Sequence, residues 1–194
     1  MLASEFHSKA IADFLAKLQG AQTTLKLTTE DDSEFLLSLR LDSSRNQNIS
    51  TTSAALSDQV NWMRAYEHRR AAGAEAYFLI VNAGVAVGSL RLYDYKLERD
   101  SFCWGSWIIR SGTSPEVAYQ SALLVYDLGF GPLRFGRAHF DVRQANPSVW
   151  KFHEKMGARL IREDVSDRYY EYSIEDYRLT RVRLAKFTQQ RLFV

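Results

Sequence analysis

The sequence has little cysteine and proline and no long apolar run. Its 194 residues contain one cysteine, Cys103, which excludes an internal disulfide and a metal site built from several cysteines. No apolar stretch approaches the roughly 20 residues that a membrane-spanning helix needs. Residues 1–7 lack the basic segment and apolar core of a secretory signal. We therefore expect a cytoplasmic protein without a membrane partner.

Neither sign of charge predominates. The chain carries 25 Lys and Arg against 23 Asp and Glu, so charge gives no argument for a nucleic-acid partner. The basic residues near the C-terminus are Arg178, Arg181, Arg183, Lys186 and Arg191. We interpret them as the solvated face of a helix. The spacing of His, Asp and Glu suggests no metal site.

The pattern of apolar residues predicts one α/β domain with a short N-terminal extension. Residues 1–20 contain an amphipathic helix that packs on its own domain or on a second subunit, and residues 21–194 form the domain. Its expected strands are 23–28, 76–81, 85–93, 102–109, 135–142, 158–164 and 168–173. Its expected helices are 29–41, 57–70, 115–128, 146–155 and 174–190, with Ser114 and Pro115 opening the third. This order predicts a mixed sheet with helices on its faces.

The segment with the most chemical character is 140–158. It reads Phe-Asp-Val-Arg-Gln-Ala-Asn-Pro-Ser-Val-Trp-Lys-Phe-His-Glu-Lys-Met-Gly-Ala. Asn146 and His153 lie about two helical turns apart, so they share one helix face. Asp141 projects from the preceding strand. The end of a strand and the start of the next helix form the crevice in which α/β sheets bind ligands.

This order of elements and this segment resemble the GCN5-related N-acetyltransferases (GNAT), over about residues 24–177. Many members have here a strand, an Asn and a short helix that ends Tyr-Glu-Lys-x-Gly-Phe; this chain has His153 for the Tyr and Ala158 for the Phe. The resemblance is to the ribosomal-protein and amino-sugar branches. It implies a mostly antiparallel central sheet flanked by helices and acetyl transfer from acetyl-CoA to an amine.

Acetyl transfer to an amine needs two proton movements. An alkyl ammonium, with a pKa of about 10, must lose a proton, and the leaving thiolate benefits from an acid. In the ribosomal-protein branch a Glu on this strand is the base and the helix Tyr is the acid. Asp141 and His153 match these two positions. An unperturbed imidazole titrates near 6.5, so His153 can give a proton near neutral pH.

Structural alternatives exist for each residue. Asp141 can simply pair with Arg143 or His139, His153 can be a buried structural histidine, and Asn146 can be only a helix cap. Glu98, Asp100 or a water molecule are alternative bases.

The loop expected to hold the cofactor departs from the family motif. The family reads Gln/Arg-x-x-Gly-x-Gly/Ala, whereas Pro115, Ala118 and Gln120 fall on the three defined positions here. We interpret this segment as a Ser/Thr-rich variant of the family's pyrophosphate loop. The negative charge of Glu116 repels a pyrophosphate, so the alternative is that CoA binding is weakened or lost. The expected cofactor-binding residues are Ile108, Ile109, Arg110, Ser111, Gly112, Thr113, Ser114, Val117, Ala118, Asn146 and Ser148.

Aromatic residues gather in the strand before that loop. Strand alternation predicts Cys103, Gly105 and Trp107 on one face, and Trp104, Ser106 and Ile108 on the other. The tryptophans either line an acceptor pocket or belong to the core.

The resemblance favours a small-molecule amine, a nucleotide-linked amino sugar for surface polysaccharide, as the acceptor. Such an acceptor needs amides, hydroxyls, an aromatic surface and cations. The expected acceptor residues are Arg45, Asn46, Asn48, Arg91, Tyr93 and Trp107, with Arg40 a further candidate. Alternatives are a protein or amino-acid N-acetyltransferase and a non-catalytic acyl-CoA-binding module. The edge strand and N-terminal helix leave room for a homodimer.

Overall fold

The computed structural model describes residues 3–44 and 52–187, and its centre is a seven-stranded sheet. The strands are β1 (Thr23–Leu27), β2 (Ala76–Asn82), β3 (Val85–Lys96), β4 (Ser101–Ile109), β5 (Arg137–Arg143), β6 (Arg159–Glu163) and β7 (Asp167–Ser173). Their order in the sheet is β1-β2-β3-β4-β5-β7-β6, and β4 with β5 is the one parallel pair among these strands. The predicted mixed, mostly antiparallel sheet is confirmed.

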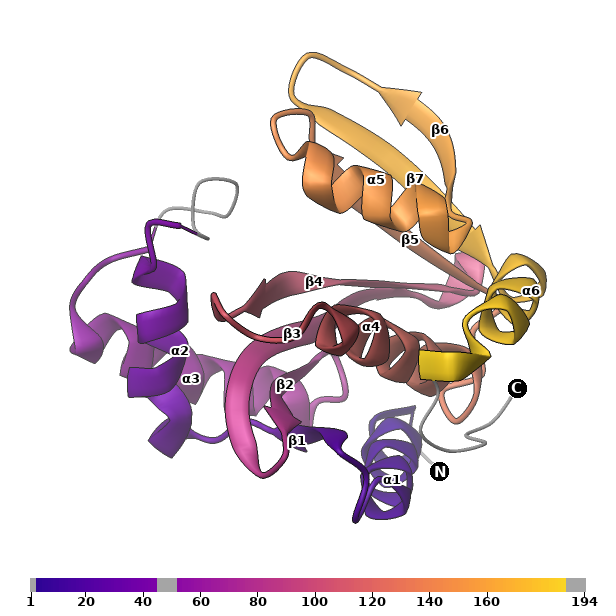
Figure 1. Ribbon diagram of the computed structural model, residues 1–194. Coiled ribbons are helices and arrows are strands. Elements are labelled where there is room, and N and C mark those ends of the chain that lie inside the picture. The colour runs from indigo at the N-terminus through magenta and orange to yellow at the C-terminus, as the bar shows by residue number, and fades with distance from the viewer. Residues whose placement is uncertain (1–2, 45–51, 188–194) are drawn as a thin grey trace.

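Helices cover both faces of this sheet (Figure 1). They are α1 (Ala3–Lys17), α2 (Ser33–Leu41), α3 (Leu56–Ala71), α4 (Pro115–Phe130), α5 (Pro147–Met156) and α6 (Ile174–Arg183), with short 3-10 turns at 30–32, 97–99 and 185–187. Residues of α2 and α3 form a small core with β2, around Met63 and Tyr66. The larger core lies on the other face, where α1 and α4 pack. The α/β class with an additional N-terminal helix is therefore confirmed.

The N-terminal helix packs on its own domain. Ile11, Phe14 and Leu18 are buried in the larger core, and Leu25 of β1 belongs to the same cluster. His7 is also buried, and its Nδ1 lies 3.2 Å from the Gly73 carbonyl oxygen. Burial of these apolar side chains is what holds α1 against the sheet.

The prediction that the basic residues near the C-terminus form a solvated helix face was wrong for Arg181, which pairs with a buried carboxylate. Its Nε lies 2.7 Å from Oδ1 of Asp127, and the Asp127 side chain is only 3% exposed. Tyr177 donates a hydrogen bond of 2.7 Å to the same carboxylate. Burial raises the pKa of Asp127 to about 7, against the opposing effects of Arg181 and Tyr177. This buried ion pair ties α6 to α4; Arg191 lies outside the described residues.

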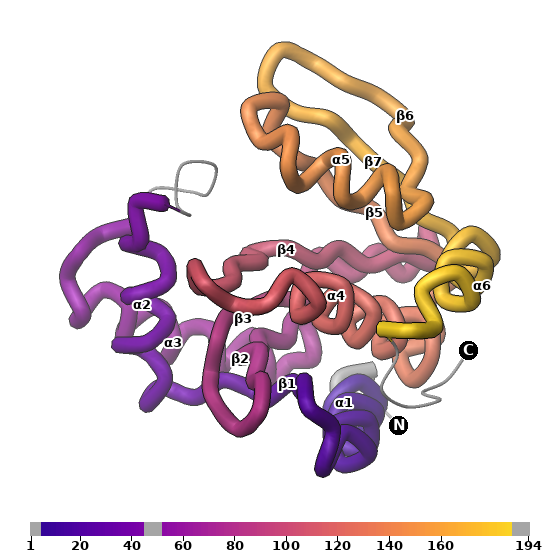
Figure 2. Tube along the Cα trace, in the orientation of Figure 1, coloured from indigo at the N-terminus to yellow at the C-terminus, as the bar shows by residue number. Residues whose placement is uncertain are grey.

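The sheet opens between β4 and β5. The two strands pair only at Ser101 with Arg137 and Phe102 with Ala138. Beyond this point they diverge, and α5 follows β5 on the far side of the opening (Figure 2). The remaining length of β4 therefore has backbone groups without a strand partner on its β5 side.

A bulge in β4 changes which tryptophans share a face. Ile108 pairs with Ser89 and Gly105 pairs with Arg91, so two residues of β4 oppose one residue of β3. Ser106 takes a φ of +49° there. The bulge brings Trp104 and Trp107 to one side, with ring centroids 5.3 Å apart. The prediction of opposite faces was wrong because simple alternation ends at a bulge.

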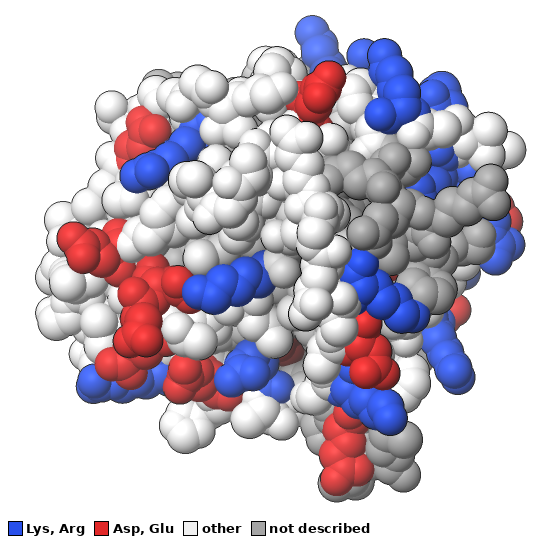
Figure 3. Space-filling view, turned by 60° about the horizontal axis from the view of Figure 1, so that its bottom comes forward, with Lys and Arg blue, Asp and Glu red and all other residues white. Residues whose placement is uncertain are grey.

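Charge distribution, helix length and the clustering of side chains bear on nucleic-acid, membrane and metal binding. Acidic and basic side chains lie interspersed over the left and lower parts of the face in Figure 3. No helix within residues 3–44 and 52–187 has the length and apolar character to cross a bilayer. In the same ranges, no three His, Cys, Asp or Glu side chains come together as a metal site.

Candidate active site

A cleft of about 280 Å³ lies where β4 and β5 separate, and we call it the catalytic cleft. Its lining includes these predicted site residues: Arg91, Tyr93, Trp107, Asp141, Asn146 and His153. Trp104, Ser106 and Arg40 also line it. Strands β3, β4 and β5 and helix α5 therefore bring together side chains that are up to 62 positions apart in the chain.

Asp141 lines the catalytic cleft, and among residues 3–44 and 52–187 its carboxylate has no side-chain partner. Arg143 pairs instead with Asp167 at 3.3 Å, and His139 pairs with Asp94 at 3.0 Å. Within the described residues no other side chain makes a hydrogen bond or ion pair with Asp141. Loss of water around the carboxyl raises its pKa, the Asp167 carboxylate adds to that effect, and Arg143 opposes it. A carboxylate with a raised pKa is a stronger base, as proton abstraction requires.

His153 is buried among aromatic rings at the inner end of the cleft. Its ring centroid lies 4.3 Å from that of Phe140 and 5.4 Å from that of Trp104. Its Nδ1 is 3.5 Å from the hydroxyl of the fully buried Tyr126. Burial lowers the pKa of His153 to about 3. The expectation of an imidazole that titrates near neutral pH was therefore wrong, because it took no account of burial.

A neutral His153 can still donate a hydrogen bond. When the Tyr126 hydroxyl donates to Nδ1, the single proton of the neutral imidazole sits on Nε2. His153 is then a fixed N–H donor rather than a source of a proton. In the other neutral tautomer Nδ1–H donates to the Tyr126 oxygen and Nε2 is an acceptor.

Arg91 is held firmly at the side of the cleft. Its guanidinium carbon lies 4.4 Å from the centroid of the Tyr93 ring and 5.6 Å from that of Trp62. The Glu75 carboxylate, 7% exposed, lies 3.6 Å from its Nε. Tyr93 in turn approaches β4 so closely that a Cβ on Gly105 would stand 2.9 Å from its hydroxyl oxygen. Glycine at this position lets Tyr93 and Arg91 occupy the cleft wall.

Asn146 stands at the N-cap position of α5 but makes no capping bond with its side chain. Its Oδ1 accepts a hydrogen bond of 2.9 Å from the Ser148 hydroxyl. The Asn146 amide therefore lines the cleft with its geometry set by Ser148, and helix capping does not explain its presence.

The loop before α4 has a definite conformation. Gly112 has a φ of +81°, in the left-handed region that favours glycine. Ser114 accepts a bond of 3.4 Å from the Glu116 N–H, which confirms Ser114 as the cap and Pro115 as the first helical residue. The Arg110 guanidinium carbon lies 5.1 Å from the centroid of the Phe35 ring. Arg110, in the loop between β4 and α4, therefore reaches α2.

The family follows from the sequence of residues 22–159, which match the model for "Acetyltransferase (GNAT) domain". The chain belongs to the GNAT family. It is accordingly an acyltransferase.

Solved structures of GNAT enzymes share this fold. A structure described as apo FdhC, a nucleotide-linked sugar GNAT, is 39% identical, covers 86% of this chain and 94% of its own, and superposes with a TM-score of 0.79. Mycobacterium smegmatis RimJ in complex with CoA-disulfide is 15% identical over 84% and 89%, with a TM-score of 0.69. A mutant of Vibrio cholerae spermidine N-acetyltransferase SpeG is 16% identical over 81% and 97%, with a TM-score of 0.68. A search of curated protein sequences found no match.

Several predicted site residues lie away from the catalytic cleft. Ile108 and Val117 are buried in the core, so their side chains do not face a ligand. Glu98 and Asp100 lie in and beside the turn before β4, at the end where β4 still pairs with β5, and neither lines the cleft. They are therefore not candidate bases. The remaining predicted residues of this segment do not line the cleft either. Ile109 ends β4, Ala118 lies in the first turn of α4, and the loop between these elements contains Arg110, Ser111 and Thr113.

Three of the predicted acceptor residues, Arg45, Asn46 and Asn48, lie outside the described residues.

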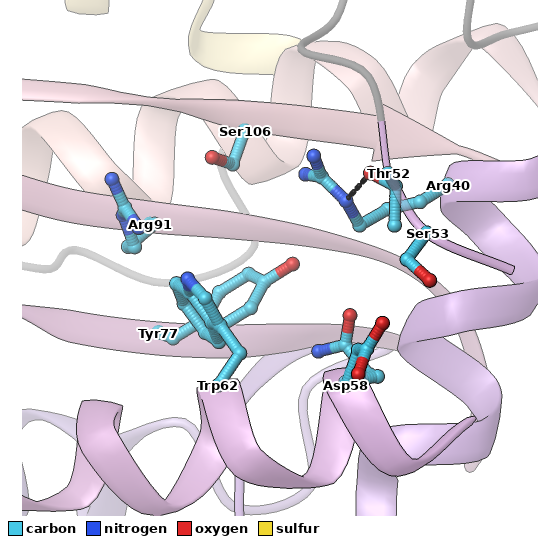
Figure 4. A pocket seen from close by; sticks show the side chains of 9 residues that line it. Arg40, Thr52, Ser53, Asp58, Trp62, Tyr77, Arg91 and Ser106 are labelled. Carbon is cyan, nitrogen blue, oxygen red and sulfur yellow. Dashed lines mark hydrogen bonds between the residues drawn. The ribbon is translucent and has the colours of Figure 1, made fainter. Parts of the chain in front are cut away.

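The structure also shows site residues that the sequence analysis missed. A second cleft of about 380 Å³ adjoins the first and contains Trp62 and Tyr77, which the sequence did not single out (Figure 4). The helical spacing of Trp62 with Tyr66 indicates a shared helix face, but no local pattern places that face beside Arg91.

Proposed function

We propose that this GNAT enzyme is an N-acetyltransferase that uses acetyl-CoA and modifies the primary amine of a nucleotide-linked amino sugar. The observation that carries the proposal is the Asp141 carboxylate, which has no side-chain partner in the described part of the chain and shares one cleft with the neutral His153. The similarity to a nucleotide-linked sugar GNAT at 39% identity supports the choice of acceptor.

The residues of the opening between β4 and β5 fit an acyl-CoA. Beyond Phe102, the β5 side of β4 has no strand partner, so its backbone groups can bind an amide-bearing chain. The Trp104 ring lines the cleft and adds an aromatic wall to it.

The start of α4 suits the phosphates less well. Backbone N–H groups at a helix start favour anions, and the Ser111, Thr113 and Ser114 hydroxyls add donors. Pro115 removes one N–H group, and Glu116 adds an exposed negative charge. Arg110 is the cation in this loop that offsets Glu116. These residues would hold the pyrophosphate as a variant of the GNAT loop.

Acetyl-CoA supplies an activated acetyl thioester, from which the acetyl group passes to the amine nitrogen as the thiolate leaves. The carboxylate of Asp141 takes the proton that the acceptor nitrogen must lose, directly or through one water molecule. His153 keeps its proton and donates a hydrogen bond within the cleft. Asn146 supplies a further amide whose orientation is set by Ser148.

Thermal unfolding with acetyl-CoA, followed by rate measurements, tests this proposal. A ligand at ~100 times its dissociation constant stabilises the folded state by about 2.7 kcal/mol, which is a readily measured rise in midpoint. Initial rates are then measured with nucleotide-linked amino sugars, free amino sugars, polyamines and peptides. If millimolar acetyl-CoA does not stabilise the protein, acetyl-CoA is not the acetyl donor. If the acetyl group passes only to peptides or polyamines, a nucleotide-linked amino sugar is not the acceptor.

Two variants test the assigned roles. Asp141→Asn and His153→Ala should each lower turnover much more than they weaken acetyl-CoA binding. Glu98→Gln is the matched control for Asp141→Asn, because Glu98 is a carboxylate in the turn before β4 that does not line the cleft. Full turnover in both Asp141→Asn and His153→Ala would refute the assignments and leave water as the base.

A further inference from the structure

The second cleft joins the catalytic cleft, and we call it the arginine pocket. Arg40, Arg91 and Ser106 line both clefts, so the two form one continuous recess. Small-molecule sites have volumes of about 300–1,000 Å³. The arginine pocket alone, at about 380 Å³, is large enough for part of a ligand whose reactive end lies at Asp141.

We propose that the arginine pocket is the subsite for the nucleoside diphosphate portion of the acceptor. Arg91 and Arg40 bind the diphosphate, Trp62 forms an apolar wall for the nucleoside, and Gln59 contacts the base. The proposal rests on the proposed function, since it assigns the other end of the same acceptor.

Arg91 has the features of a preorganised phosphate ligand. Its side chain is 21% exposed and lies between the rings of Trp62 and Tyr93, with Glu75 at its Nε. Glu75 is itself held by Arg69, whose Nε lies 2.6 Å from Oε1. An arginine fixed in this way loses little conformational freedom when it binds an anion. Its position at the junction of the two clefts suits the phosphate next to the sugar.

Arg40 provides the second cation. It projects from the last turn of α2, and its Nε donates a hydrogen bond of 2.6 Å to the Thr52 hydroxyl. Figure 4 shows Arg40 and Arg91 entering the pocket from opposite sides, with Tyr77 between them. Both arginines line the pocket, and both guanidinium groups oppose the rise in the pKa of Tyr77 that burial causes. Two arginines that line one pocket match the charge of a diphosphate.

The remaining walls suit a nucleoside. Trp62 is partly exposed, and its ring presents apolar surface to the pocket. Gln59 is 7% exposed, and its amide offers both the donor and the acceptor that a base edge needs. Asp58 is exposed and also lines the pocket. Its one negative charge stands against the two positive charges of Arg40 and Arg91, so the side chains that line the pocket have a net positive charge.

Direct titration of UDP and dTDP in the presence of saturating CoA tests the proposal. CoA also carries a diphosphate, so saturation with CoA prevents the nucleotides from binding at the start of α4. Uridine, thymidine and inorganic pyrophosphate are titrated in parallel. We expect the nucleoside diphosphates to bind, the nucleosides to bind much more weakly, and binding to quench tryptophan fluorescence in wild type but not in Trp62→Phe.

The variants Arg40→Gln and Arg91→Gln should each weaken nucleoside diphosphate binding by about 10- to 100-fold. Arg64→Gln is the control, because Arg64 is an exposed arginine of α3 that pairs with Glu30 outside the pocket. In acetyl transfer, Arg40→Gln should raise KM for a nucleotide-linked sugar by a much larger factor than KM for the free amino sugar.

The outcomes separate this proposal from the proposed function. Transfer to a nucleotide-linked sugar with unchanged KM in Arg40→Gln would refute the subsite and leave the function standing. Nucleoside diphosphate binding that depends on Arg40 and Arg91, without transfer to any amine, would support the subsite and contradict the function. No binding of UDP or dTDP at millimolar concentration would refute the subsite.

Discussion

The burial of His153 predicts a measurable loss of stability in mild acid. In the unfolded chain an imidazole has a pKa of about 6.5, whereas burial lowers the pKa of His153 to about 3 in the folded protein. Between pH 6.5 and pH 3 the imidazole therefore binds a proton in the unfolded state and stays neutral in the folded state. Stability must fall as the pH falls from 6.5 towards 3, and this contribution is absent above pH 7.

The size of the effect follows from these two pKa values. Linkage gives a loss of about 2 kcal/mol between pH 7.5 and pH 5.0 from His153 alone. At pH 5.0 the result depends mainly on the unfolded pKa, since pH 5.0 lies above the folded value. Other groups change stability over the same range, and Asp127, with a pKa raised to about 7, acts in the opposite direction. A comparison of wild type with His153→Gln removes these shared contributions.

The assay is urea unfolding at the two pH values, followed by tryptophan fluorescence. Trp104 contacts His153, so its emission reports on this part of the core. Wild type should lose about 2 kcal/mol more than His153→Gln on going from pH 7.5 to pH 5.0. His68→Gln, a change of an exposed histidine on α3, should behave as wild type. Equal losses in wild type and His153→Gln would refute the reasoning and show that the imidazole is protonated in the folded protein.

Three further predictions concern the cleft and its support. Because its pKa is raised, Asp141 should become protonated at a higher pH than an ordinary carboxyl, and kcat/KM should begin to fall at that higher pH as the solution is acidified. Asp141→Asn should abolish this acidic limb of the pH–rate profile and lower kcat by about 100- to 10,000-fold. Gly105→Ala should push the Tyr93 ring from its place and raise the acceptor KM while acetyl-CoA still stabilises the protein, and an unchanged KM would contradict the close packing. Arg181→Met should destabilise the fold by about 3–5 kcal/mol, more at pH 8 than at pH 6, because a buried Asp127 without its cation resists ionisation. Adding Asp127→Asn should restore part of that loss in urea unfolding, and no recovery would argue against a buried unpaired charge as the cause.

Asp141 and His153 illustrate how much of the site the sequence could predict. Asp141 and His153 are on adjacent elements, a strand and the helix that follows it, so local spacing was sufficient to place both in one cleft. The chemical state of each residue was beyond that reasoning. The pKa of His153 depends on Phe140, Trp104 and Tyr126, which come from three different elements.

The sequence by itself determined the order and type of the elements, the cap at Ser114 and the shared helix face of Asn146 and His153. These features depend on residue propensities and on the period of each element, which act over a few positions. The tertiary structure alone decided the bulge at Ser106 that brings Trp104 and Trp107 to one side, and the pairing of Arg181 with the buried Asp127. It also decided the approach of Arg40 and Arg91 from separate elements. Each of these depends on which distant segment packs alongside, and burial, charge pairing and strand register are properties of those contacts.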